Sequence, residues 1–166
     1  MRFLNLPGVL GLAAVLIGTL SANASAEPHM QSFQYFVGRW SCAGHFVANG
    51  AEIKSTVTFT YDAPTATLSV RHDDLAPNKY HAVELWGAAG SAYRNTMGDA
   101  YSGIRWFRSP GFVGDRLSWT RNDGTGAPAE RFTYLRQGAR MGIEWWIAKP
   151  GAGLALGDTS DCRRSA

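Results

Sequence analysis

Hydrophobic and polar positions alternate along most of the chain from residue 39 onward. Residues 52–61 show the pattern most clearly, with Ile53, Val57 and Phe59 on one face and threonines on the other. A period of two is typical of a β-strand with one buried and one solvated face. The runs that read as strands are 39–47, 52–61, 67–72, 80–86, 92–97, 101–107, 115–121, 130–136, 140–148 and 154–162.

Short turn signals separate these runs, and no long helical period interrupts them. Asn49-Gly50 and Asn122-Asp123-Gly124 are strong hairpin signals. A chain of many short strands must hide its sheet edges, and an up-and-down barrel does so by closing on itself. The sequence therefore predicts an all-β fold, an antiparallel up-and-down β-barrel of about 8–10 strands. A two-sheet sandwich is the alternative architecture.

The segment before the first strand, residues 28–37, places Met30, Phe33 and Phe36 at helical spacing. Pro28 suits the first turn of a helix. We expect either a short N-terminal helix across one end of the barrel or an extended lead-in to the first strand.

Residues 1–26 have the pattern of a secretory signal peptide. Arg2 precedes an apolar run over 4–20, and Ala24-Ser25-Ala26 supplies the small residues of a cleavage site. Cleavage there leaves a single domain, residues 27–166, with no transmembrane segment in the mature chain. The sequence therefore predicts a periplasmic or secreted protein.

The chain has two cysteines, Cys42 and Cys162, on the first and last predicted strands. In an exported protein such a pair indicates a disulfide. Closing a barrel brings those two strands together, so the bond would fasten the seam. Two free thiols or a metal pair are the alternatives, but no CxxC motif or nearby histidine spacing favours a metal.

The formal net charge is +3, and the basic residues are scattered along the chain. This distribution argues against a nucleic-acid partner. The common hydrolase, zinc-protease and P-loop motifs are absent from the sequence. Glu84, Glu130 and Glu144 lie within predicted strands, where we expect them to pair with arginines on the outer face. The sequence thus predicts no catalytic residues and no metal site, and it favours a protein that is not an enzyme.

Gly38-x-Trp40 opens the first strand directly after the lead-in segment. Together with the meander of strands, this motif resembles the calycin superfamily: lipocalins, fatty-acid-binding proteins and small lipocalin-like or nitrobindin-like bacterial barrels. The resemblance implies that Gly38 and Trp40 close one end of the barrel. It also implies an arginine from the far end of the chain against that tryptophan, for which Arg140, Arg163 and Arg164 are the candidates.

The same resemblance implies a cavity for a small hydrophobic or amphipathic ligand. Aromatic side chains with polar tips suit a pocket that grips such a ligand and orients it with a few hydrogen bonds. The alternative is that they fill the core of a small barrel. The candidate ligand-binding residues, taken from the more apolar strand faces, are Phe59, Tyr61, His72, Trp106, Trp119, Phe132, Tyr134 and Trp145.

Two other functions are compatible with the sequence. A protein-binding barrel, such as a periplasmic protease or lysozyme inhibitor, would use the loops 88–91, 109–114 and 122–128, in which Phe112 is the one aromatic anchor. A haem-binding barrel, the third interpretation, would use His72 as an axial ligand. No other cofactor is expected.

Overall fold

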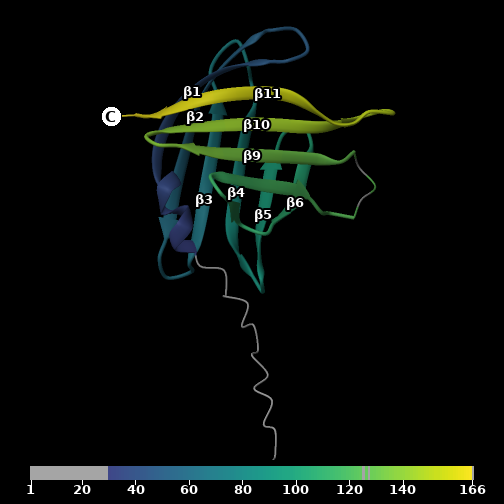
Figure 1. Cartoon of the computed structure of the whole chain (residues 1–166). Coiled ribbons are helices and arrows are strands. Elements are labelled where there is room, and N and C mark those ends of the chain that lie inside the picture. Colours follow the sequence, from purple (N-terminus) through teal and green to yellow (C-terminus); the bar gives the residue numbers. More distant parts are fainter. Residues whose placement is uncertain (1–29, 125, 127, 166) are drawn as a thin grey trace, which may run out of the picture.

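A closed antiparallel β-barrel is the architecture of the protein in a computed structural model that describes residues 30–124, 126 and 128–165 (Figure 1). The predicted signal peptide lies outside these residues. A short 3-10 helix, η1 (Met30–Phe36), precedes the sheet. The strands are β1 (Gly38–Phe46), β2 (Glu52–Asp62), β3 (Thr67–Asp74), β4 (His81–Ala89), β5 (Ala92–Asp99), β6 (Gly103–Ser109), β7 (Phe112–Val113), β8 (Arg116–Arg121), β9 (Glu130–Gln137), β10 (Arg140–Lys149) and β11 (Gly153–Arg164).

The wall of the barrel is made from ten of the described strands. Neighbours in sequence pair from β1 to β6 and from β8 to β11, β1 pairs with β11, and β6 pairs with β8 to complete the ring. The two-residue strand β7 pairs with β8 alone among the described strands. The predicted all-β barrel with a short N-terminal helix is confirmed, whereas the sandwich and the extended lead-in are wrong.

The seam between β1 and β11 is fastened where the sequence predicted. Cys42 lies directly opposite Cys162 in the register, and the two form a disulfide with a Cα–Cα distance of 4.0 Å. At the end of the seam, two residue pairs from the disulfide, Trp40 faces Arg164. The guanidinium of Arg164 covers the Trp40 ring, so Arg164 is the residue that fills the predicted role, rather than Arg140 or Arg163.

One end of the barrel is filled by aromatic side chains under η1. Phe36 stacks on Phe59 with ring centroids 5.3 Å apart, and Phe33 meets Trp86 edge to face at 5.9 Å. The Trp40 indole, fully buried, donates a hydrogen bond of 2.7 Å to the backbone oxygen of Phe36. These contacts turn the apolar face of η1 into a plug, so the open volume of the barrel lies at the opposite end.

The predicted inner face of β6 is inverted in the structure. Ile104 and Trp106 are 65% and 49% exposed, and Arg105 and Phe107 are buried instead. The reason is that Arg105 has two carboxylate partners inside the barrel, Asp99 and Glu130, which make burial of its charge tolerable. A pattern that treats every arginine as solvent-facing assigns this strand the wrong face.

Candidate functional site: an internal cavity

A cavity of about 550 Å³ occupies the end of the barrel away from η1. The strands place it there: β1 runs from Trp40 in the plug to Phe46 on the cavity wall, and β2 returns from Ile53 to Phe59. Apolar and aromatic side chains form much of the wall, namely Phe46, Ile53, Phe132, Ile143, Trp145 and Ile147.

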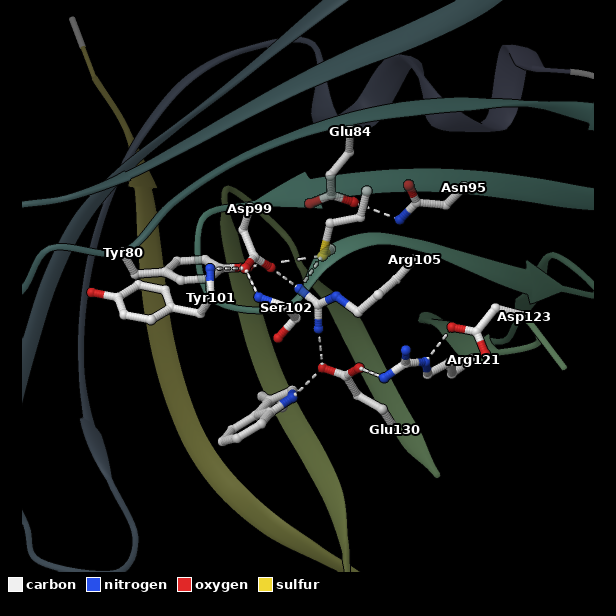
Figure 2. Close-up of polar contacts among 12 residues, drawn as sticks. Tyr80, Glu84, Asn95, Asp99, Tyr101, Ser102, Arg105, Arg121, Asp123 and Glu130 are labelled. Carbon is white, nitrogen blue, oxygen red and sulfur yellow. Dashed lines mark hydrogen bonds and ion pairs between the residues drawn. The ribbon is translucent and has the colours of Figure 1, made fainter. Parts of the chain in front are cut away.

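A chain of alternating acidic and basic groups crosses one side of the cavity (Figure 2). Arg105 donates to Glu130 at 2.5 Å and to Asp99. Arg121 lies 3.6 Å from Glu130 and donates to Asp123 at 2.5 Å. Burial works against the charge of Arg105, but the hydrogen bond and the charge of Glu130 outweigh it and raise the pKa of that guanidinium. The chain is therefore a fixed ionic element of the wall.

Glu84 is a buried carboxyl group on the same cavity wall. One of its oxygens accepts hydrogen bonds from Trp86 Nε1 at 2.7 Å and Asn95 Nδ2 at 2.5 Å, and the other lies 3.5 Å from Tyr134 Oη. Burial raises the pKa of Glu84 even though the bonds from Trp86 and Asn95 oppose the shift. No guanidinium among the described residues donates a hydrogen bond to it.

Two further carboxyl groups, Asp74 on β3 and Asp158 on β11, lie on the cavity wall near His72. His72 Nε2 is 3.1 Å from Asp74 Oδ1, and the His72 ring meets Tyr80 edge to face. Asp158 is partly buried nearby; burial raises its pKa to about 6, with His72 lowering and Asp74 raising it. The carboxyl group of Asp158 accepts no hydrogen bond from the described side chains.

A β-bulge in β11 makes room for the Trp145 indole on the cavity wall. The register between β10 and β11 shifts after Trp145, which pairs with Asp158, while the next residue pairs with Leu156. Gly157 therefore has no partner residue on β10. A Cβ atom built on Gly157 would lie 2.3 Å from Trp145 Cε3. The indole thus lies directly on the glycine backbone and donates a 2.8 Å hydrogen bond to Glu130.

Four of the predicted ligand-binding residues line the cavity: His72, Phe132, Tyr134 and Trp145. The others lie elsewhere. Phe59 and Trp119 are buried in the plug at the closed end, and Tyr61 packs against that same core. Trp106 lies on the outer face of β6. Ligand binding by any of the eight residues stays a prediction. Phe59, Trp119 and Trp106 do not border the cavity.

The charged residues of the cavity were missed or misplaced by sequence reasoning. Glu84 and Glu130 were expected on the outer face and are instead 5% and 3% exposed; of the three strand glutamates, Glu144 alone meets the expectation, with Arg116 at 3.1 Å. The available signal was strand parity: Glu84 shares its face with Ala82 and Trp86. Phe112, expected as a loop anchor, also packs inward, against Phe36.

The described residues include no group of three or more histidine, cysteine, aspartate or glutamate side chains placed to hold a metal ion. Within the same part of the chain, no helix is long and apolar enough to cross a membrane.

Comparisons with known proteins support the barrel fold and assign neither a family nor a function. No family model matches the sequence, and no curated protein does. Among solved structures, the chain is similar to Rv2717c from M. tuberculosis, with a TM-score of 0.63 and 13% sequence identity over 84% of this chain and 98% of that one. The likeness shows that a bacterial barrel of nearly the same extent shares this fold.

Proposed function

We propose that this protein is an exported barrel that binds a small apolar or amphipathic molecule in its internal cavity. The observation that carries the proposal is the cavity of about 550 Å³, walled by aromatic and aliphatic side chains and bordered by a few fixed polar groups. This combination is typical of small-molecule sites. A barrel whose interior served the core alone would be filled with side chains at both ends.

Membership of the calycin superfamily is part of this proposal. It is supported by Gly38-x-Trp40 at the barrel entry, Arg164 against Trp40, and the likeness to Rv2717c. The ten-stranded wall departs from the eight strands of lipocalins. Export is supported by the signal-like residues 1–26 and by the Cys42–Cys162 disulfide, a bond that oxidising compartments favour.

The test is native mass spectrometry of protein purified from a periplasm, with an absorption spectrum of the same sample. A retained mass that is lost on denaturation supports the proposal, and a Soret band would identify haem. Ile147→Trp, which adds bulk to the cavity wall, should weaken retention, whereas the matched change Ile104→Trp on the outer face should leave it unchanged. Equal retention by both variants would contradict binding in the cavity.

A second candidate function is recognition of another protein. Val83, Leu85, Ile104 and Trp106 are each about half exposed or more, and they stand on the outer face of β4 and β6. The register places Leu85 and Trp106 on either side of Thr96, so the three side chains form one row across the outer face. Exposed apolar groups that gather in this way often mark interaction surfaces. A protein partner captured by the purified barrel, together with an empty cavity, would favour this function.

A further inference from the structure

We propose that the cavity selects a cationic amphiphile, a small apolar molecule that carries a protonated amine. The inference rests on the proposed binding function and adds the charge of the ligand. Its basis is the way in which the charged side chains around the cavity are already paired, because those pairs decide which ionic group of a ligand finds an unused partner.

The two guanidinium groups of the wall are occupied by protein carboxylates. Arg105 uses both terminal nitrogens on Glu130 and Asp99, and Arg121 lies between Asp123 and Glu130 (Figure 2). An anionic head group is bound best by two parallel N–H groups of one guanidinium. Both terminal nitrogens of Arg105 are engaged, and Arg121 already donates to Asp123 and lies 3.6 Å from Glu130. A ligand carboxylate would therefore have to compete with these acidic partners for either guanidinium, and displacing one would leave its charge unpaired.

The remaining donor of Arg105 does not change this conclusion. Its Nε is buried and has no hydrogen-bond partner among the described residues. A single N–H suits a neutral oxygen, such as a hydroxyl or a water molecule, better than a carboxylate. Lys79 is the other cation on the cavity lining, and it is exposed on the loop before β4, where solvent and salt weaken its attraction for an anion.

Carboxyl groups outnumber cations around the cavity. Buried or partly buried carboxyl groups belong to Asp74, Glu84, Asp99, Asp123, Glu130 and Asp158. Asp99, Asp123 and Glu130 pair with Arg105 and Arg121. The carboxyl groups without an arginine partner are those of Asp74, Glu84 and Asp158. Among the described residues, the one basic side chain in contact with those three is His72, at 3.1 Å from Asp74. The wall thus holds more negative than positive groups.

Asp158 is the best-placed partner for an ammonium group. Its carboxyl group borders the cavity, is partly removed from water, and accepts no hydrogen bond from a described side chain. A protonated amine beside it would supply the missing opposite charge. The faces of Tyr80 and Trp145 on the same lining can add cation–π attraction, and the apolar walls take the chain of the ligand.

The experiment compares three probes of equal chain length, decylamine, decanol and decanoate, by titration calorimetry on the mature protein at pH 7 and 0.15 M salt. We expect decylamine to bind at least about tenfold tighter than decanol, and decanoate to bind most weakly. Asp158→Asn should bring the ratio of decylamine to decanol affinity close to one. Asp115→Asn, an exposed matched control, should change neither.

Each outcome decides a separate point. Decanoate binding as tightly as decylamine, or equal binding of all three probes, overturns the cationic preference and leaves the proposed binding function standing. If none of the three probes binds, the proposed function itself is overturned. An unchanged preference in a folded Asp158→Asn protein overturns Asp158 as the partner, and Glu84→Gln then shows whether the buried glutamate takes that role.

Discussion

The guanidinium carbon of Arg164 lies 4.4 Å from the centre of the Trp40 ring, so the last strand of the barrel covers the tryptophan of the first. Arg164 also donates hydrogen bonds to the backbone oxygens of Val37, at 2.5 Å, and of Tyr35. One side chain therefore joins the C-terminal strand, the start of β1 and the end of η1. The seam has two fastenings, this contact and the Cys42–Cys162 disulfide.

Arg164→Ala is expected to destabilise the barrel. The substitution removes a cation–π contact and two hydrogen bonds from a charged donor, which together contribute about 1–2 kcal/mol. Urea unfolding followed by tryptophan fluorescence measures the loss. The adjacent Arg163→Ala is the control, because the Arg163 side chain is exposed and makes no hydrogen bond, ion pair or ring contact with the described residues. It should change the free energy of unfolding by less than about 0.5 kcal/mol. Equal losses for the two variants would contradict a specific role for Arg164.

Arg105→Met is expected to cost about 3–5 kcal/mol of unfolding free energy, because it leaves Asp99 and Glu130 buried without their cation. The matched change Arg116→Met breaks an exposed pair with Glu144 and should cost less than about 1 kcal/mol. Denaturant titration of both variants checks the contrast.

A second substitution separates lost charge pairing from lost packing at Arg105. Asp99→Asn removes one unpaired charge and keeps an oxygen for the backbone N–H groups of Tyr101 and Ser102. The double variant should therefore recover part of the stability lost by Arg105→Met. A double variant less stable than Arg105→Met would show that packing, not charge, dominates.

Gly157→Ala should displace the Trp145 indole, since the added methyl group would lie 2.3 Å from its ring. We expect a loss of about 1–3 kcal/mol and a changed near-ultraviolet circular dichroism spectrum, because the indole must leave its hydrogen bond to Glu130. Gly98→Ala is the control: its methyl group meets only Val83, at 4.0 Å. An unchanged spectrum for Gly157→Ala would mean that Trp145 does not lie on this glycine in solution.

Asp158 should make the barrel less stable as pH rises from about 4 to about 6. Its pKa of about 6 in the folded state exceeds the usual aspartate value of about 3.9, so the folded state holds the proton more tightly in that window. Above pH 6 the ionised group destabilises the fold. Asp158→Asn should therefore stabilise the protein by about 1–2 kcal/mol at pH 7, and the gain should vanish below pH 4.

Thermal unfolding of the Asp158→Asn and wild-type proteins between pH 3.5 and 8 measures this dependence. His72 and Asp74 also face Asp158 and act on its pKa, so the difference between the two proteins is the quantity to compare. Asp115→Asn, at an exposed position, should show no such pH-dependent gain. A stability difference that grows toward acid would contradict the raised pKa.

Strand parity alone determined most of the architecture. The alternation in residues 52–61 puts Ile53, Val57 and Phe59 on the inner face, as the structure shows. The two cysteines on the first and last strands predicted the disulfide that joins those strands. These features are local: a side chain's face follows from its position in the strand, and a meander leaves few ways to close a sheet.

The level of each side chain along the barrel axis was decided by tertiary structure. Phe59 and Phe132 both lie on inner faces, yet the first is in the plug beneath η1 and the second lines the cavity. Alternation along a strand predicts which face a side chain is on, but not its position along the barrel axis. That position depends on where η1 packs and on the register between strands.

The charged wall of the cavity depended on tertiary structure for a second reason. Arg105 can turn inward only because Asp99, on the neighbouring strand, and Glu130, 25 positions away in the sequence, come together around it. A buried charge is tolerated when its partners are in place, and partners distant in sequence are brought together by the closed sheet. The sequence by itself thus determined a barrel with an apolar interior, and the fold decided which end is open and which charges line it.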